Sequence, residues 1–540
     1  MHSRSRITLG LVVLLALALR PGAALAIDNS SARISSLGGD HVAGVIPDLY
    51  TDIGVNPAYA FFADKLNMGY ARRRNPGCTP SLPYLMEGSG DRSGPSMMVD
   101  ELSAWGIRLS SWRTAVFAQW ALYRPESVSS YPYIGFDNGA YVELREEGYS
   151  SNNDFARIDL IAARALGDRH TLGLRVQGRA YNNYASDLSA YAYDRYYDLF
   201  FTDLYSQRRE TRIRSFSGRR YSLDLQAGMA KSDDTGPRTD LTIKASLNRP
   251  DHRQERYELD ISKEYDQVGE IDAYSYYRYY WNDAREGNIW SLALMFRHFF
   301  DGGIRVLAGG DVSTCSYETE WSSSVERLRW GWQETDSKVA GAFDGDGSLL
   351  GGHCFFKGGK VFSLHRTTDL YLGLHGVFSR TRAEEEPLVH YAIETDGEES
   401  AVRFDQPVRL ESIETSFDLF FPFSVEFRPS SFFTYYSSFV LYGKWRKLSA
   451  TYPIPSLFTY RPPVSVSRVG GASLAGTSSQ AVIEPAAYLT DWERNLSTGS
   501  AVTLGFSFHY KDRFFIDVYS GTEIIPTNLT NQVIDIRYAF

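Results

Sequence analysis

The feature that most constrains the fold is a period-two alternation that recurs in pairs along the chain. In HTLGLRVQGRAY, from His170, the apolar residues fall on one face and Arg175, Gln177 and Arg179 fall on the other. Side chains of a strand alternate between its two faces, so one face here is apolar and the other polar. The preceding stretch FARIDLIAARA pairs with it across the short connection at 167–169. The pattern predicts a β-hairpin.

The same hairpin pattern returns five more times, always with a very short turn. Between the hairpins lie long polar segments, which we expect to be loops: residues 181–218, 249–286, 314–350, 381–408 and 444–497. Short turns at one end and long loops at the other are typical of outer-membrane barrels. Strands of about ten residues cross a bilayer when tilted, and in lipid no sheet edge stays unpaired. We therefore predict an all-β, transmembrane, antiparallel up-and-down barrel.

Counting back from the C-terminus, and adding weaker strands at about 62–72, 99–109 and 113–123, gives about 16 strands in residues 61–540, with 14 as the alternative. An even count is typical of single-chain bacterial barrels. A soluble solenoid or propeller would show a fixed sequence period, and none is found. The last residues, NQVIDIRYAF, alternate to the end, and Tyr538 and Phe540 share one face. This ending resembles the C-terminal signal that the barrel-assembly machinery recognises.

The N-terminus predicts export. A basic start, an apolar run at residues 7–19 and Ala24-Leu25-Ala26 form a signal peptide, so we expect residues 1–26 to be cleaved. The apolar run is too short to span a bilayer, and no stretch of about 20 apolar residues follows it. We therefore expect the mature chain in the bacterial outer membrane, with lipid as a partner.

An exported chain meets oxidising conditions, so its three cysteines bear on disulfide formation. Cys315 and Cys354 lie at the two ends of one predicted loop and are the candidate pair. The alternative is that both, together with Cys78, are free thiols.

Composition and motifs favour neither nucleic-acid binding nor catalysis. The formal charge is -9 and no basic stripe is present, so nucleic acid is not an expected partner. Serine-hydrolase elbow, zinc-helix and nucleotide-binding motifs are missing from the sequence, so we expect no enzyme activity and no cofactor. Asp344 and Asp346 lack the other carboxylates of a calcium loop, so we expect no metal site. The remaining loop histidines, without an accompanying motif, are expected to be solvated: His252, His353 and His390.

Charged and amide residues at inward positions of the strands are candidates for lining the lumen. Charge on the lipid-facing side is costly at mid-depth, so these side chains are expected to face inward. They either line a pore or fill it as salt bridges, and the pattern does not choose between the two. The candidates are Arg175, Gln177, Arg179, Asp224, Asp240, Lys244, Glu414, Asp418, Asp535 and Arg537.

Two predicted extracellular loops are crowded with tyrosine, at residues 191–205 and 274–281. The chain holds 36 tyrosines, and a ring with one apolar and one wet end suits an exposed binding surface. Stacking rings beside arginines would suit an apolar or sugar ligand. The alternative is that the loops merely pack on one another. The candidate residues are Tyr193, Arg195, Tyr196, Tyr277, Arg278 and Tyr280.

The segment after the signal peptide, SSARISSLGGDHVAGVIPDLYTDIGVNPAYAFFADKL, resembles the start of the outer-membrane hydrophobic-compound transporters, which include the long-chain fatty acid channels. The resemblance covers about forty residues. The family's usual pair of adjacent acids is missing, and Ile46-Pro47-Asp48 stands there instead. The matching positions are Leu37, Gly38, Gly39, Asp48, Asn56, Pro57 and Ala58.

This resemblance implies that residues 27–60 form a plug or leader segment ahead of the barrel wall. It also implies a channel for passive uptake or export of small hydrophobic solutes, with a small hydrophobic ligand as a partner. The alternative is a non-transporting receptor, adhesin, or secretion or assembly subunit that works through its extracellular loops. The sequence leaves the substrate and the oligomeric state open.

Overall fold

A computed structural model describes the chain from residue 31 to residue 539, with gaps at 76–96, 124–125, 137–139, 198–203, 234–235, 267, 269, 331–334, 396–397, 404–409, 454–457, 461–480, 486–487, 512 and 521–531. The expected signal peptide at 1–26, Cys78 and Phe540 lie outside the described residues. Within them, no helix has both the length and the apolar character needed to cross a membrane.

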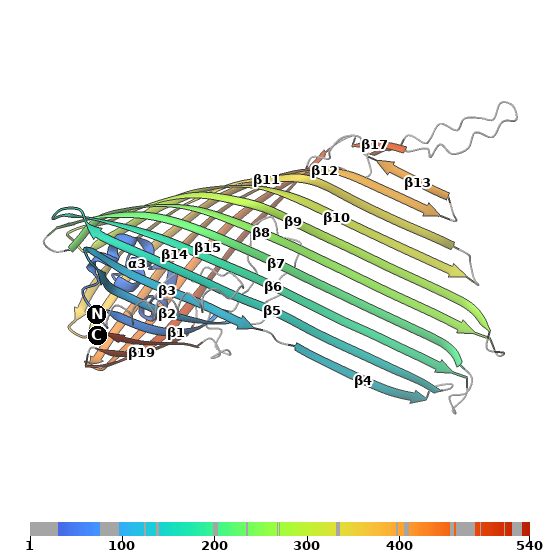
Figure 1. Ribbon diagram of the computed structural model, residues 1–540, viewed down its shortest axis with the longest axis horizontal. Helices are drawn as coiled ribbons and strands as arrows, with labels where there is room; N and C mark the ends of the chain where they lie inside the picture. The colour runs from blue at the N-terminus through green and yellow to red at the C-terminus, as the bar shows by residue number, and fades with distance from the viewer. Residues whose placement is uncertain are drawn as a thin grey trace.

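The strands close into one antiparallel barrel (Figure 1). Closure comes from β1 pairing with both β2 and β20, and sixteen strands follow one another around the wall. The predicted count of 16 is therefore confirmed. The wall strands are, in order, β1 Asn67–Asn75, β2 Met97–Leu109, β3 Trp112–Tyr123, β5 Ala140–Ala165, β6 His170–Tyr196, β7 Leu204–Asp233, β8 Gly236–Tyr265, β9 Ile271–Phe299, β10 Ile304–Trp330, β11 Thr335–His365, β12 Thr368–Thr395, β14 Leu410–Ser430, β15 Phe433–Pro453, β18 Tyr488–Tyr510, β19 Phe514–Ser520 and β20 Gln532–Ala539.

Four short strands lie outside this ring order. β4 (Glu126–Phe136) continues beyond β3 and pairs with the upper part of β5. β13 (Glu398–Arg403) pairs with β12, and β16 (Phe458–Tyr460) pairs with β17 (Ala481–Pro485). All four lie at the end of the molecule with the long hairpins.

The outer face carries a belt of exposed apolar side chains near the end with the short turns. On β7 this belt includes Leu223 and Leu225, and on β14 it includes Phe421 and Phe423. Their neighbours in sequence point to the inside, as strand alternation requires. A closed sheet with an apolar outer belt is the arrangement that lipid demands, because no backbone group is left unpaired at an edge. The predicted transmembrane barrel is therefore confirmed.

The wall is far taller on one side than on the other. Strands β5 to β12 have 26–31 residues each, whereas β19, β20 and β1 have 7–9. At about 3.3 Å per residue, a 30-residue strand is about 100 Å long, several times what a bilayer needs. The prediction of loops at 181–218, 249–286, 314–350 and 381–408 was wrong for most of these residues, because they extend the β-hairpins. In the predicted loop 444–497, the described residues 444–453 and 488–497 are strand as well. Above the lipid both faces meet water, so the apolar alternation that identifies a strand fades.

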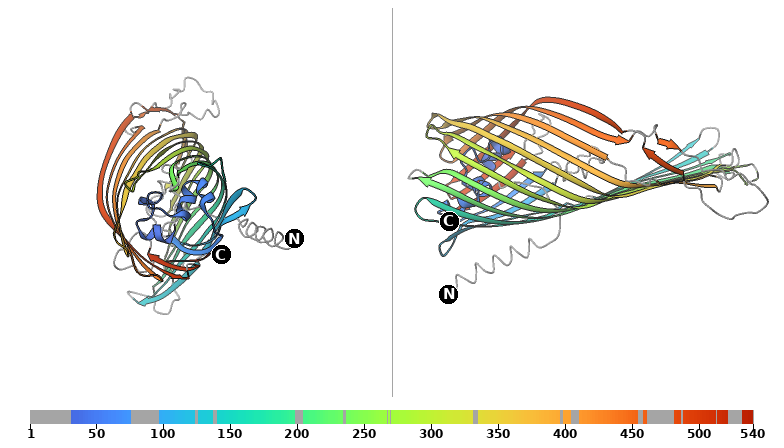
Figure 2. Two further views of the ribbon diagram at one scale, coloured as in Figure 1. Left: turned by 90° about the vertical axis from the view of Figure 1, so that its left-hand side faces the viewer. Right: turned by 90° about the horizontal axis from the view of Figure 1, so that it is seen from above.

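From residue 31 on, the described N-terminal part forms four short helices, which lie inside the ring of strands (Figure 2). They are α2 (Ala32–Ser36), η1 (Gly39–His41), α3 (Leu49–Val55) and η2 (Pro57–Phe62). We call residues 31–63 the lumenal segment. It lies at the end of the barrel that holds the short turns and the C-terminal strand. The barrel wall begins at Asn67, a few residues after the boundary at 61 that the sequence suggested.

Candidate functional site

The lumenal segment owes its shape to capping side chains. Ser31 and Asp48 accept hydrogen bonds from backbone N–H groups in the first turns of α2 and α3. Asn56 is extended, as a residue before proline favours, and its side chain accepts from the Ala58 N–H at 2.9 Å to cap η2. The Asn-Pro-Ala motif is thus a helix start. Gly38, at φ 113°, makes the left-handed turn between α2 and η1.

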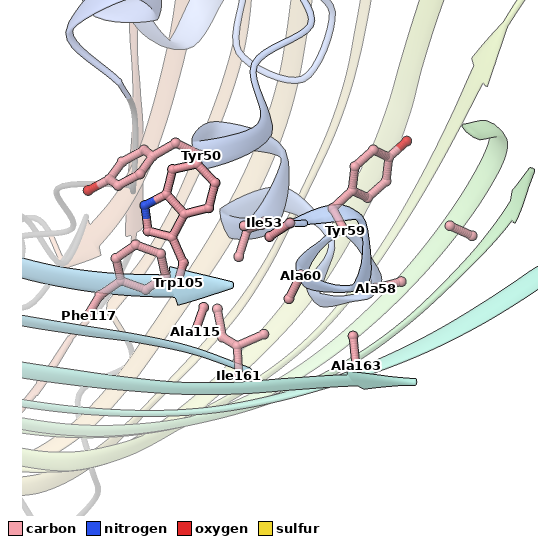
Figure 3. Packing of buried hydrophobic residues seen from close by; sticks show 12 residues of the cluster. Tyr50, Ile53, Ala58, Tyr59, Ala60, Trp105, Ala115, Phe117, Ile161 and Ala163 are labelled. Carbon is pink, nitrogen blue, oxygen red and sulfur yellow. The ribbon is translucent and has the colours of Figure 1, made fainter. Parts of the chain in front are cut away.

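Apolar packing fixes both ends of this segment to the wall. Tyr50, Ile53 and Tyr59 pack against Trp105, Phe117 and other inward residues of β2, β3 and β5 (Figure 3). A second cluster, which includes Ile34 and Val42, packs against Leu307, Tyr371 and Tyr436 on the opposite side. The segment therefore bridges the lumen and is not a free leader.

Wall side chains also donate hydrogen bonds to backbone carbonyls of the lumenal segment. Arg175 donates to Gly54 O at 2.7 Å, and Ser424 donates to Leu37 O at 2.7 Å. Five more carbonyls of the segment accept in the same way: Ser36 from Thr503, Asp40 from Lys357, Gly44 from Arg297, Val45 from Arg305 and Val55 from Gln226. Buried carbonyls need such partners, so the wall completes the hydrogen bonding of a segment too short to satisfy itself.

Arg297 is the central ion of this interface. Its guanidinium, fully buried on β9, pairs with Asp240 of the wall at 2.7 Å and with Asp52 of the lumenal segment. It lies over the Tyr59 ring, 4.4 Å from the centroid, and Tyr59 donates to Asp240 at 2.9 Å. A buried charge is tolerated when partners surround it in this way. Sequence reasoning identified Asp240 and missed Arg297, although Arg297 stands at an inward position directly after the mainly apolar stretch 289–296 of β9.

The inner wall is divided into two halves. In the charged half, which runs over β19, β20 and β1 to β8, ion pairs form within strands and between neighbouring strands. Arg157 and Arg175 both pair with Asp159, at 2.6 and 2.8 Å, and Asp224 accepts from Arg179 and Lys244, at 3.1 and 2.8 Å. Gln177 donates to Asp159, and Arg537 pairs with Asp517. These groups neutralise one another within the wall.

The other half, over β9 to β18, is lined mainly by small and aromatic side chains. Ile289, Cys315, Tyr317, Leu349 and Ala383 form one buried cluster on its inner face. Inward tyrosine rings lie directly over wall glycines. They lie so close that a Cβ added to the glycine would overlap the ring. The pairs are Tyr317 on Gly347, Tyr371 on Gly359 and Tyr442 on Gly499. Glycine–aromatic pairs of this kind stabilise strands and keep the rings flat against the wall. We call this the small-and-aromatic half.

The ten lumen candidates from the sequence all lie on the inner face by the strand register, but in different surroundings. Eight belong to the ion-paired wall or the contact with the lumenal segment. Glu414 and Asp418 are on β14 in the small-and-aromatic half, where Asp418 stands opposite Lys444 on β15.

The six tyrosine and arginine candidates do not meet at one site. They lie in β6 and β9, which are separated by β7 and β8, and not in loops. By alternation Tyr193 and Tyr277 face inward, whereas Arg278 and Tyr280 face outward. Arg195 lies over Tyr205, and Arg278 over Tyr257, so each arginine stacks on a different strand. Tyr196 stands at a register shift at the end of β6.

The proposed disulfide is contradicted, because Cys315 and Cys354 are both free. In the β10–β11 register Cys315 stands opposite Leu349 and Cys354 opposite Gly310, so five residues separate the two positions along the ladder. Five residues is an odd step, so one sulfur faces the lumen and the other faces outward. Asp346 likewise lies in strand β11 and not in the loop that we expected at 314–350.

Comparison with known proteins finds no matching family model and no matching curated protein. Among solved structures, the chain is similar to the outer membrane transporter YddB from Escherichia coli, at 9% identity and a TM-score of 0.20 over 88% of this chain and 81% of that chain. The chain is also similar to the siderophore receptor PirA from Pseudomonas aeruginosa, at 8% identity and a TM-score of 0.25 over 88% of this chain and 80% of that chain. For the CymD monoaromatic hydrocarbon channel the identity is 10% and the TM-score 0.25, over 96% of this chain and 99% of that chain. Superpositions this loose carry no argument about function, and kinship to the hydrophobic-compound transporters stays a prediction.

Proposed function

We propose that the protein is an outer-membrane channel through which small hydrophobic solutes pass without an energy source, with the lumenal segment as its gate. The observation that carries this proposal is the position of that segment, which bridges the lumen at the end with the short turns. The division of the wall supports it. The charged half is closed by its own ion pairs, so the small-and-aromatic half offers an apolar solute the surface with the least desolvation cost.

Passage then requires the lumenal segment to move. The segment is held by hydrogen bonds to its carbonyls, by the ion pairs Asp52–Arg297 and Arg33–Glu426, and by two apolar clusters. A segment held in this way is expected to populate an undocked state that solutes use, without a change in the barrel wall.

The test is uptake of the apolar dye N-phenyl-1-naphthylamine by cells that carry the protein, with liposome swelling in L-arabinose as the polar comparison. Leu349→Asp places a charge in the small-and-aromatic half and should slow dye uptake several-fold. Asn183→Asp makes the same charge on the inner face of β6, in the charged half, and should leave dye uptake unchanged. Both variants must first show the heat-modifiable migration of a folded barrel. Equal dye uptake by the two variants and the wild type would contradict the proposed route.

The extended hairpins favour a second candidate, a receptor or adhesin. Hairpins that extend far beyond the apolar belt, with tyrosines such as Tyr131 and Tyr133 more than half exposed, provide a large surface outside the membrane. Dye uptake no faster than in cells without the protein would favour this reading over transport.

A further inference from the structure

One contact between the lumenal segment and the wall is a pair of histidines. His41 ends η1, and His375 lies on the inner face of β12 with 7% of its surface exposed. Their Nδ1 atoms are 3.1 Å apart. The Phe420 ring of β14 stacks on both, with centroid distances of 4.1 Å to His41 and 5.3 Å to His375. The pair is therefore held between a lumenal helix and two neighbouring strands.

This contact restricts how many protons the two rings hold. A hydrogen bond between the two Nδ1 atoms needs one N–H donor and one lone pair. One added proton is compatible with the bond, because the charged ring still donates. A second proton removes the acceptor and brings two cations together at hydrogen-bond distance. Full protonation and the docked geometry are therefore mutually exclusive.

The surroundings make even the first proton unfavourable. Lys357 of β11 donates to the Asp40 carbonyl beside His41, and Lys444 of β15 lies 5.2 Å from the centroid of Tyr442 and 5.9 Å from that of Phe420. The nearby carboxylates are Asp40 of η1 and Asp418, two residues from Phe420 on β14. Burial, followed by the two lysines, lowers the pKa of His41 to about 4.

We propose that His41 and His375 form a proton-sensitive latch, which holds the lumenal segment against β12 at neutral pH and releases it in acid. The latch itself depends only on the contacts above. Its effect on passage rests on the function proposed for the channel.

The direction follows from linkage. Undocked, His41 meets water and recovers its ordinary pKa of 6.5, whereas docked its pKa is about 4. The docked state is therefore favoured in full above about pH 6.5, and this advantage is lost as the pH falls towards 4. For one proton the ratio of docked to undocked segment falls by at most about 300-fold, the antilogarithm of the difference between the two values, and this limit is reached only well below pH 4.

The test is amide hydrogen exchange of the full-length barrel in detergent between pH 7.5 and 4, corrected for intrinsic exchange rates. The amides of Val42, Ala43, Val45 and Ile46 report on docking, because each is hydrogen-bonded within the segment. In the wild type their protection should fall with acid by tens-fold or more. His41→Gln and His375→Gln keep a polar side chain that does not titrate, so this fall should be largely absent. His353→Gln removes another lumenal histidine, one paired with Asp311, and should behave as the wild type.

Two results would overturn the latch: acid-independent protection in the wild type, or an undiminished fall in both glutamine variants, which would assign the acid effect to carboxylates such as Asp52.

Planar-bilayer conductance in KCl over the same pH range separates the latch from the channel. Protection that falls in acid without any rise in conductance supports the latch and contradicts passage past the segment. If neither conductance nor protection changes with pH, the latch is contradicted. The proposed channel still stands in that case if removal of the lumenal segment opens the barrel.

Discussion

At the scale of single residues, glycines on the inner wall decide how closely the lumenal segment approaches it. A Cβ at Gly173 would overlap the backbone of Pro57 and Ala58, and one at Gly228 would overlap the Asn56 side chain. A third wall glycine, Gly505, faces Ser36 in the same way. These positions lack a side chain because another part of the chain occupies its place.

Gly173→Ala is therefore expected to weaken docking of the lumenal segment while the barrel still folds. Overpacking of a close contact costs about 1–3 kcal/mol, here subtracted from docking. Exchange protection of the amides in 52–59 should drop, and heat-modifiable migration should persist. The matched control is Gly178→Ala on the same strand, where a Cβ would meet only Ile158 at 3.8 Å. Full protection in Gly173→Ala would show that the segment does not pack there.

At the scale of elements, each long strand crosses two environments. On β7, Leu225 and Ile213 share the outer face and are 51% and 38% exposed. Leu225 lies in the apolar belt, twelve residues nearer the short turns than Ile213. Only the first is expected to meet hydrocarbon, because a strand this long extends well past the bilayer.

An arginine at these two positions locates the edge of the lipid. Leu225→Arg should destabilise the inserted barrel by about 2–4 kcal/mol, the cost of arginine at the bilayer midplane. Ile213→Arg should change little, since that face meets water. Urea titration of folding into liposomes measures both. Equal losses would place Ile213 in lipid, and the absence of loss at Leu225 would place the belt elsewhere.

The sequence predicted the elements in the belt well and those above it poorly. Alternation is strong where one face meets lipid, so strands such as β6 and β14 and their short turns were identified. Beyond the belt, stretches such as 204–214 carry polar residues on both faces and look like loops, although cross-strand ion pairs such as Arg208–Asp260 hold them in the sheet.

The candidate site was only partly accessible to the same reasoning. The alternation of the strands assigned Asp240 and Arg175 to the inner face, and the resemblance at the N-terminus identified Asn56. Other partners that hold the lumenal segment, such as Ser424 and Thr503, were missed, because they contact backbone carbonyls, which leave no trace in the sequence. His41 and His375 are 334 residues apart, and only the fold brings them together.

At the scale of the whole molecule, the barrel combines a closed wall with a lumen that its own N-terminus spans. The charged half neutralises itself through ion pairs, the small-and-aromatic half faces it across the lumen, and the lumenal segment packs on both. The wall on the β5–β12 side stands far above the membrane, whereas the described parts of β19, β20 and β1 have only 7–9 residues. The molecule is thus asymmetric about its axis as well as along it.

The most direct test of this account is single-channel conductance in planar bilayers, comparing the full chain with a variant that lacks residues 31–62. Removal of the segment that bridges the lumen should convert rare, brief openings into long-lived ones of higher conductance, in a barrel that still migrates as folded. Identical traces from the two proteins would contradict the claim that the N-terminus closes the channel.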